Sequence, residues 1–448
     1  MKKLYFLITF IAICTYSNAQ ILIGSSNLNE ARYMHDSELL NNGKVLAVGG
    51  DNGVWLSPES FSSCELYNPA TNSWSFTGSM NQERHLLATA MLPSGNVLAI
   101  GGSNVDLDAL SSCEIYDIAT STWSYTDSML QERKFHDAIE LSDGRILVVG
   151  GLPTTNTTEI YDPSTSTWSY TGDVNVRRDL GFSLVMLVDG RIMVSGGDDA
   201  QSKNSAEIYD PQAGTWQLIP NDLTESRKYH SSVLLDNGQV LIVGGSNYFP
   251  DKSELFDPVS NTFSASITMQ EVRSGTPAIK LDNGNVLVYG FGDMFNFFDT
   301  KIIEVYNHTY QSWSSDPYSG GGVSGYTIHK LMDGNILTVA GNFSTGNGAS
   351  SGCRLIGQDP NSNETAESSD EVVIYPNPSS DVLSVLVRNH TGTQKLNIFD
   401  VLGKVVLSKE LTNKSSKVQV SHLQQGTYHF NIECDNRVYA KSSLIICR

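Results

Sequence analysis

Basic residues are scarce in this sequence of 448 residues. It contains 29 Lys and Arg against 48 Asp and Glu, which gives a formal net charge of −19. Binding to a nucleic-acid backbone requires clustered basic side chains that displace counterions from the phosphates. The composition therefore argues against a nucleic-acid partner. An acidic balance favours solubility and carries no information about the fold.

Long apolar runs are almost absent as well. The first of them, residues 4–13, follows the basic pair Lys2 and Lys3 and is too short to span a bilayer as a mature helix. Small residues lead up to Ala19, as they do at a cleavage site. We therefore predict a signal peptide over residues 1–19 that is removed on export. No later stretch predicts a transmembrane helix.

Cysteine is the third scarce residue, with six in the chain. Acylation of Cys14 would make the chain a lipoprotein, but bulky Ile13 stands where a small residue is expected. The other five are an odd number, which excludes a complete disulfide framework. Three of them share one small, buried position of the repeat described below and are predicted to be structural thiols: Cys64, Cys113 and Cys353. Cys434 and Cys447 could pair, although their spacing does not require it.

An apolar segment that ends in Gly-Gly recurs through most of the chain. Five clear copies stand at 45–50, 97–102, 146–151, 192–197 and 240–245, and two degenerate copies follow at 286–292 and 336–341. A turn dipeptide such as Asn42-Gly43 precedes each copy and provides the positive φ of a tight hairpin. The period of roughly 46 to 52 residues is typical of propeller blades and exceeds that of shorter solenoid repeats.

A second element follows each Gly-Gly pair. It places two aromatic residues seven positions apart, in the pairs Tyr67 and Trp74, Tyr116 and Trp123, Tyr161 and Trp168, Tyr209 and Trp216, Phe256 and Phe263, and Tyr306 and Trp313. The fixed spacing predicts a strand, a turn and another strand. With an inner strand before each turn dipeptide, every repeat has four strands. The Gly-Gly strands are continuously apolar, as expected where neighbouring blades cover both faces.

These repeats resemble the bacterial form of the kelch family over roughly residues 21–360, and the central domain of galactose oxidase is similar. The resemblance implies an all-β fold with a β-propeller of six or seven blades, and we count seven copies. The seventh copy lacks its outer strand. Alignment of Arg32 with Arg84 sets residues 21–26 at the place of an outer strand. We therefore expect a seven-bladed propeller over residues 20–357, closed by the N-terminal strand.

Two charged positions also recur in register. Arginine precedes the inner strand at Arg32, Arg84, Arg133, Arg227 and Arg273, and glutamate stands in the Tyr strand at Glu65, Glu114, Glu159, Glu207, Glu254 and Glu304. A ring of arginines near a propeller axis could bind an anion. The seventh repeat has Val323 and Arg354 at these positions, so both charges are lost together. This joint loss favours structural ion pairs. The fourth repeat is shifted, with Arg177 and Arg178 near the expected position.

The loops after Gly-Gly leave one face of the expected propeller and vary in length. They carry aromatic residues that are candidate ligand contacts: Trp55, Phe61, Tyr248, Phe249, Phe295 and Phe297. Aromatic side chains on functional loops suit the binding of sugars or peptides. The alternative for each is packing of its loop onto the propeller. Asp106 and Asp198 lie on the same loops, but no EF-hand spacing supports a cation site, so we predict no metal.

The composition changes near residue 358. Residues 358–372 are polar and acidic, which predicts a linker. Residues 373–448 alternate short strands with turn glycines and predict a small antiparallel β-sandwich. Their YPNP start, the DVLGK turn at 400–404 and the LxxGxY segment at 423–428 resemble the type A C-terminal sorting domain of the type IX secretion system of Bacteroidota. The resemblance implies export across the outer membrane, then release or attachment at the cell surface.

Together these patterns predict a secreted or cell-surface propeller, monomeric and exported by the type IX machinery, that recognises a glycan or a protein through loops on one face. The alternatives are a secreted carbohydrate-active oxidase or isomerase, and a structural surface protein without a discrete ligand. We find no set matching the copper ligands of kelch oxidases, and no G-x-S-x-G or H-E-x-x-H motif. We therefore assign no catalytic residue, metal or cofactor, and the question of catalysis stays open, with binding favoured.

Overall fold

The computed structural model describes residues 20–54, 59–153, 155–198, 203–245, 251–289, 302–317, 323–324, 326–343, 349–358, 372–375, 382–387, 394–400, 404–411, 415–424, 426–434 and 437–446. The chain contacts separate one compact unit, Gln20–Gly357, from a second that contains the residues from Gln358 onward. Throughout the described ranges the regular structure consists of β-strands. Those ranges contain no helix long and apolar enough to cross a membrane.

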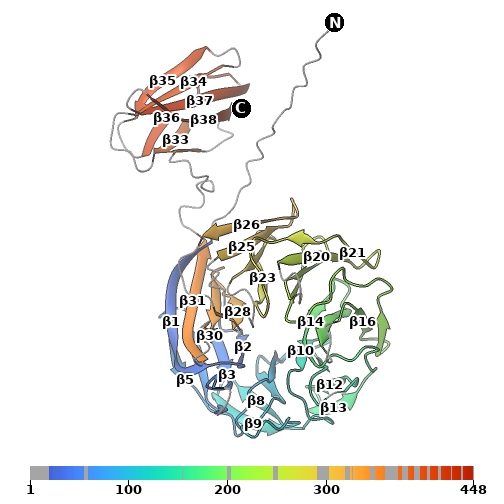
Figure 1. Cartoon of the computed structure of the whole chain (residues 1–448). Coiled ribbons are helices and arrows are strands. Elements are labelled where there is room, and N and C mark those ends of the chain that lie inside the picture. The colour runs from blue at the N-terminus through green and yellow to red at the C-terminus, as the bar shows by residue number, and fades with distance from the viewer. Residues whose placement is uncertain are drawn as a thin grey trace. The chain divides into compact units, whose positions relative to one another are not determined.

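Seven sheets form the first unit, and each is one blade of a β-propeller (Figure 1). The first two blades contain β2 (Asp36–Leu39), β3 (Val45–Val48), β4 (Cys64–Asn68) and β5 (Ser73–Phe76), then β6 (Ala88–Met91), β7 (Val97–Ile100), β8 (Cys113–Asp117) and β9 (Thr122–Thr126). The next two contain β10 (Asp137–Glu140), β11 (Ile146–Val149), β12 (Glu159–Asp162) and β13 (Thr167–Tyr170), then β14 (Leu180–Met186), β15 (Ile192–Asp198), β16 (Ala206–Asp210) and β17 (Thr215–Leu218).

The remaining blades are less regular. The fifth contains β18 (Ser231–Leu234), β19 (Val240–Val243), β20 (Lys252–Asp257), β21 (Thr262–Phe263) and β22 (Ile267–Thr268), and the sixth contains β23 (Ala278–Lys280), β24 (Val286–Val288), β25 (Ile302–Asn307) and β26 (Ser312–Pro317). The seventh contains β27 (Val323–Ser324), β28 (Thr327–Lys330), β29 (Ile336–Val339), β30 (Gly341–Phe343) and β31 (Ala349–Gln358), and β1 (Gln20–Arg32) pairs with β31. The seventh blade therefore joins the two ends of the propeller sequence.

The inner strands form a closed ring. Each of β2, β6, β10, β14, β18, β23 and β28 lies beside the inner strand of the next blade, and β28 lies beside β2. The core of the propeller lies between successive blades: Leu46 and Val48 of the first blade, for example, pack against Val97 and Tyr116 of the second. Burial on both faces explains why the second strand is apolar at every position in the first, second, third and fifth blades.

The Gly-Gly pairs are required by a close approach between blades. Gly101 and Gly102 have φ values of 50° and 104°, a region that side chains other than glycine rarely adopt. The amide of Gly102 donates to the carbonyl of Arg133 in the next blade at 2.8 Å. A Cβ on Gly101 would lie only 2.7 Å from that carbonyl oxygen. The glycines thus let two backbones meet where neighbouring blades join.

Substitution of Gly101 tests this account. We expect Gly101→Ala to lower the free energy of unfolding by about 2–4 kcal/mol, because left-handed strain adds to a backbone clash. Gly238→Ala is the matched control: its φ is also positive, at 84°, but its nearest new contact is the Val188 side chain at 3.6 Å. It should cost about 1 kcal/mol. Equal losses in urea unfolding would show that the approach between blades is not tight.

The second unit contains two antiparallel sheets. One consists of β32 (Val372–Tyr375), β33 (Val382–Val387) and β36 (Ser415–Gln419), and the other of β34 (Gln394–Phe399), β35 (Val405–Leu411), β37 (Gly426–Cys434) and β38 (Arg437–Ile446). The buried side chains of Leu396, Ile398 and Val418 come from both sheets. This unit is the small C-terminal β-sandwich that the alternation of short strands and turns predicts.

Candidate functional site

The recurring arginines and glutamates lie inside the blades. The structure pairs Arg32 with Glu65, Arg84 with Glu114, Arg133 with Glu159, Arg178 with Glu207, Arg227 with Glu254, and Arg273 with Glu304, at nitrogen–oxygen distances of 2.8 to 3.3 Å. All twelve side chains are fully buried. The shift in the fourth repeat kept Arg178 off the sequence-derived set, and the structure gives it the position of the other arginines.

Each glutamate also holds the chain segment that enters its blade. Glu114 accepts hydrogen bonds from the amide and side chain of Asn81 and from the amide of Gln82. Arg84 donates to the carbonyl of Gly101 at 2.8 Å, so the pair also fixes the Gly-Gly strand of the same blade. These contacts pair the arginine and glutamate charges with one another inside the protein. The arginines are therefore not available to bind a ligand.

The aromatic candidates fall mostly outside the described residues: this applies to Trp55, Tyr248, Phe249, Phe295 and Phe297. Phe61 is described and half-buried. The guanidinium carbon of Arg32 lies 5.6 Å from the centre of its ring, and its amide donates to the carbonyl of Gly50. Within the described part of the chain, Phe61 thus packs on the propeller and does not line the cavity described below.

Six residues at the start of the inner strands of the first six blades share an unusual backbone conformation. Their φ values are all positive, between 51° and 68°, at Met34, Leu86, Phe135, Gly181, Tyr229 and Gly275. Backbone hydrogen bonds link neighbouring members: the amide of Leu86 donates to the carbonyl of Met34 at 2.9 Å, and the amide of Phe135 donates to that of Leu86 at 3.1 Å. The same link runs from Gly275 to Tyr229 to Gly181. We call these six residues the axial collar.

The axial collar stores backbone strain at four positions. A left-handed conformation costs an ordinary residue about 1 kcal/mol or more and costs glycine nothing comparable. The fourth and sixth blades place Gly181 and Gly275 there, whereas the other members are large, half-buried side chains. Strained residues of this kind cluster at functional sites. The strained positions therefore indicate a candidate functional site next to the axial collar.

A cavity of about 340 Å³ opens beside the axial collar, over the first three blades. Three collar side chains, Met34, Leu86 and Phe135, form one wall, and Val54 and Leu107 from the loops after Gly-Gly add further apolar surface. The polar lining consists of Tyr33, Asp51, His85 and Lys134. A small, largely apolar cavity with a few convergent polar groups is the usual form of a ligand site.

Local pairing assembles this cavity. The segment that enters the first blade pairs with the loop after its Gly-Gly, since the amides and carbonyls of Tyr33 and Asp51 are mutually hydrogen-bonded at 2.9 and 2.7 Å. His85 and Ser103 form the same pair in the second blade. Entering segments and Gly-Gly loops thus meet at one face, which is the face that the loop lengths indicated.

The polar groups of the cavity have shifted pKa values. Burial raises the pKa of Asp51 to about 6, even though its Oδ1 accepts a hydrogen bond from the amide of Gly53 at 2.8 Å. Burial, with a smaller contribution from the Lys134 charge, lowers the pKa of His85 to about 4. Burial and the Asp51 charge raise the pKa of Tyr33 to about 12. Near neutral pH the cavity therefore presents a carboxylate, a neutral imidazole and a neutral phenol.

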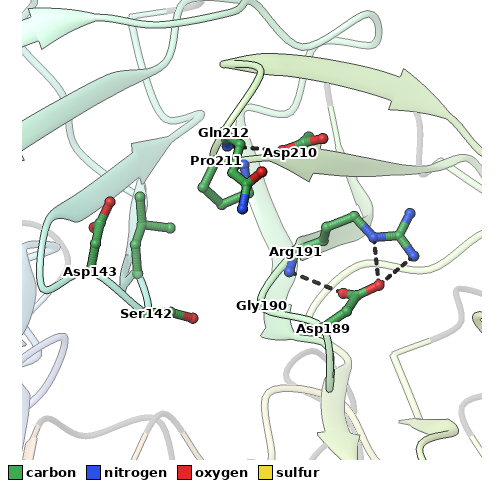
Figure 2. Close-up of a pocket in the computed structure, with 9 residues that line it drawn as sticks. Ser142, Asp143, Asp189, Gly190, Arg191, Asp210, Pro211 and Gln212 are labelled. Atoms are coloured by element: carbon green, nitrogen blue, oxygen red, sulfur yellow. Dashed lines mark hydrogen bonds and ion pairs between the residues drawn. The ribbon is translucent and has the colours of Figure 1, made fainter.

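The face opposite the loops after Gly-Gly has grooves between neighbouring blades. One of about 400 Å³ lies between the third and fourth blades and is lined by Asp143, Asp189, Arg191 and Asp210 (Figure 2). Arg191 binds Asp189 at 2.8 Å, and Asp210 accepts the amide of Gln212 within its own turn. A similar groove follows between the next two blades. Among the described residues no group of three or more His, Cys, Asp or Glu could hold a metal ion. These grooves are features of the repeated turns.

Sequence reasoning missed the residues that line the cavity. Positive φ at Met34, Leu86 and Phe135 is invisible in a sequence, and Asp51 and His85 belong to different repeats. The sequence did contain one signal that could have found them. Alignment of the repeats puts Gly275 at the position of Met34, Leu86 and Phe135, and a position that glycine shares with large residues indicates a backbone conformation in which the large residues are strained.

Comparisons with known proteins agree with this architecture. The Kelch motif model matches residues 40–81, 88–130 and 182–222, and the model described as a secretion system C-terminal sorting domain matches residues 373–446. No curated protein matches the chain. One similar solved structure is titled a novel fungal alcohol oxidase of the AA5 family in complex with copper. It is 14% identical, covers 95% of this chain and 99% of its own, and has a TM-score of 0.61. This likeness concerns the fold alone.

Proposed function

The chain is a kelch-motif β-propeller with a type IX secretion sorting domain, exported to the cell surface or beyond, and from this premise we propose that it is a binding propeller whose ligand site is the cavity beside the axial collar. The observation that carries this proposal is the strain at Met34, Leu86 and Phe135. The fourth and sixth blades have glycine at this position, so the backbone conformation does not itself require a large side chain. The role of the three large side chains as a cavity wall would explain why the strained conformation is kept.

The size of the cavity limits what enters it. About 340 Å³ accommodates one sugar unit of a glycan or one side chain of a protein, and the remainder of such a ligand would rest on the surrounding loops. The apolar wall suits the body of that group, and the few polar residues would fix its orientation. An extracellular glycan or protein remains the proposed partner.

A collar variant tests this proposal. We expect Phe135→Gly to weaken the binding of any ligand found on a glycan array or in a screen of extracellular proteins by at least tenfold, because one wall of the cavity is lost. The melting temperature should stay level or rise, since glycine relieves the left-handed strain. Val259→Ala, at an exposed turn residue on the opposite face, is the matched control and should bind normally.

Two results would contradict the proposal. Full binding by Phe135→Gly would place the ligand site elsewhere. Stoichiometric copper in the purified protein, together with oxidation of an alcohol, would replace a binding function with catalysis. Metal analysis of the exported protein is therefore the companion measurement.

A further inference from the structure

Asp51 and His85 both line the cavity, and each has one side-chain polar atom engaged in a hydrogen bond. Oδ1 of Asp51 accepts the Gly53 amide, and Nδ1 of His85 lies 2.8 Å from the hydroxyl of Ser60. The two remaining atoms, Oδ2 of Asp51 and Nε2 of His85, are 4.0 Å apart. This separation is too long for a direct hydrogen bond. It leaves room for a third atom that bonds to both.

The Asp51 carboxylate has no cationic partner. His85 is neutral because burial lowers its pKa to about 4, and among the described residues no lysine or arginine forms an ion pair with Asp51. The nearby Lys134 ammonium is tied to the carbonyl of Leu107 at 2.5 Å. A largely buried carboxylate without a counter-charge is unfavourable, and a bound cation would relieve this cost.

The walls of the cavity suit an alkyl cation. Tyr33 and Phe135 present aromatic rings, which attract cations, and Met34, Leu86 and Leu107 provide apolar surface for a carbon chain. The surrounding unit is strongly acidic: residues 20–357 contain 38 Asp and Glu against 18 Lys and Arg. Such a field concentrates cations near the surface.

We propose that the ligand of this cavity inserts a primary alkylammonium group, whose nitrogen donates to Oδ2 of Asp51 and Nε2 of His85. The inference rests on the proposed binding function and names the chemistry of its ligand. An ammonium nitrogen has three protons and can serve both acceptors, with Nδ1–H of His85 donating to Ser60. A sugar hydroxyl can serve the pair only in the other His85 tautomer, by donating to Asp51 and accepting from Nε2–H, and it brings no positive charge to the Asp51 carboxylate. A lysine side chain and an amino sugar share this chemistry.

The pH dependence of binding follows from the groups that face the bound nitrogen. These are Asp51, Tyr33, His85 and Lys134. Asp51, with a pKa of about 6, titrates between pH 5 and 8, whereas the pKa values of Tyr33 and His85 lie near 12 and 4. A cation requires the ionised carboxylate. Amine affinity should therefore be constant above about pH 7 and fall towards tenfold per pH unit below pH 6.

The test uses the full exported chain and defined probes. Isothermal titration calorimetry at pH 7.5 with n-butylamine, glucosamine and Nα-acetyl-lysine methylamide distinguishes a simple ammonium, an amino sugar and a lysine side chain. The neutral counterparts n-butanol, N-acetylglucosamine and Nε-acetylated lysine are the controls. We expect butylamine to bind, butanol not to bind, and one of the two larger amines to bind more tightly than butylamine.

Two variants predict effects of opposite sign. Asp51→Asn keeps the acceptor for Gly53 but removes the charge, and should weaken amine binding by at least tenfold and abolish the loss below pH 6. Lys134→Gln removes a repelling charge and should strengthen amine binding two- to fivefold. Equal binding of butanol and butylamine, or unchanged amine affinity in a folded Asp51→Asn protein, would overturn the inference.

Failure of this inference is distinguishable from failure of the proposed function. If Phe135→Gly abolishes binding of a glycan or protein ligand while no amine probe binds, the cavity is the site and its ligand is not an ammonium. If Phe135→Gly has no effect on either kind of binding, the cavity itself is not the site.

Discussion

Replacement of Arg133 by methionine is expected to lower the free energy of unfolding by about 3–5 kcal/mol. Arg133 donates to Glu159 through Nε at 3.2 Å and Nη2 at 3.0 Å, and also to the carbonyl of Gly150 and the hydroxyl of Thr157. Methionine fills much of the volume but offers no donor. It leaves the Glu159 carboxylate buried without a cation, which is the costly part of breaking such a pair.

An exposed ion pair in the same blade is the matched control. Arg145 pairs with Asp143 at 2.7 Å near the surface, where solvent screens the interaction, so Arg145→Met should cost less than about 1 kcal/mol. The double variant Arg133→Met with Glu159→Leu should recover part of the loss, because no buried charge remains. Recovery stays incomplete because the amides of Leu130 and Gln131 also lose their acceptor.

Equilibrium urea unfolding of the three variants decides between a structural pair and an anion site. A structural pair predicts the ordering given above. An anion site predicts that Arg133→Met is tolerated and that phosphate raises the melting temperature of the unaltered protein but not of the variant. The complete burial of Arg133 and Glu159 supports the first outcome.

The strands that repeat in every blade could be predicted from the sequence, because a feature that recurs in register in several repeats rarely arises by chance. The seven-residue spacing from Tyr116 to Trp123 recurs in the other repeats, and the structure pairs Val97 with Tyr116 and Tyr116 with Trp123 in successive strands. The loss of both charges in the seventh repeat pointed to Arg–Glu pairing by the same logic. Spacings that recur across the repeats therefore predict the order and the register of the strands.

The candidate site could not be predicted because it depends on departures from the repeat. The position of Asp51 carries aspartate again only at Asp198 of the fourth blade, the position of His85 carries other residues in the other blades, and their approach to 4.0 Å follows from the meeting of two blades. The strain at Phe135 depends on a backbone angle. A one-residue shift in the fourth repeat hid Arg178. Sequence reasoning located the loop face, and three-dimensional contacts were needed to select the residues on it.

Deletion of residues 20–27 is expected to open the propeller. These residues belong to β1, which pairs with β31 and packs against the first blade, where the indole of Trp74 donates to Ser26 at 3.2 Å. The deletion removes roughly one ladder hydrogen bond per residue, each contributing about 0.5–1 kcal/mol, so stability should fall by about 4–8 kcal/mol. It also exposes the edge of β31 to other chains.

The measurement is light scattering during size-exclusion chromatography over a range of concentrations, together with urea unfolding. We expect the shortened chain to form concentration-dependent oligomers through β31, and a peptide of residues 20–28 added in trans to restore the monomer. Deletion of residues 361–368 removes the same length from the acidic segment after the propeller and should change neither property. A monomeric, equally stable protein without residues 20–27 would mean that contacts between the inner strands of the first and seventh blades, β2 and β28, suffice to close the ring.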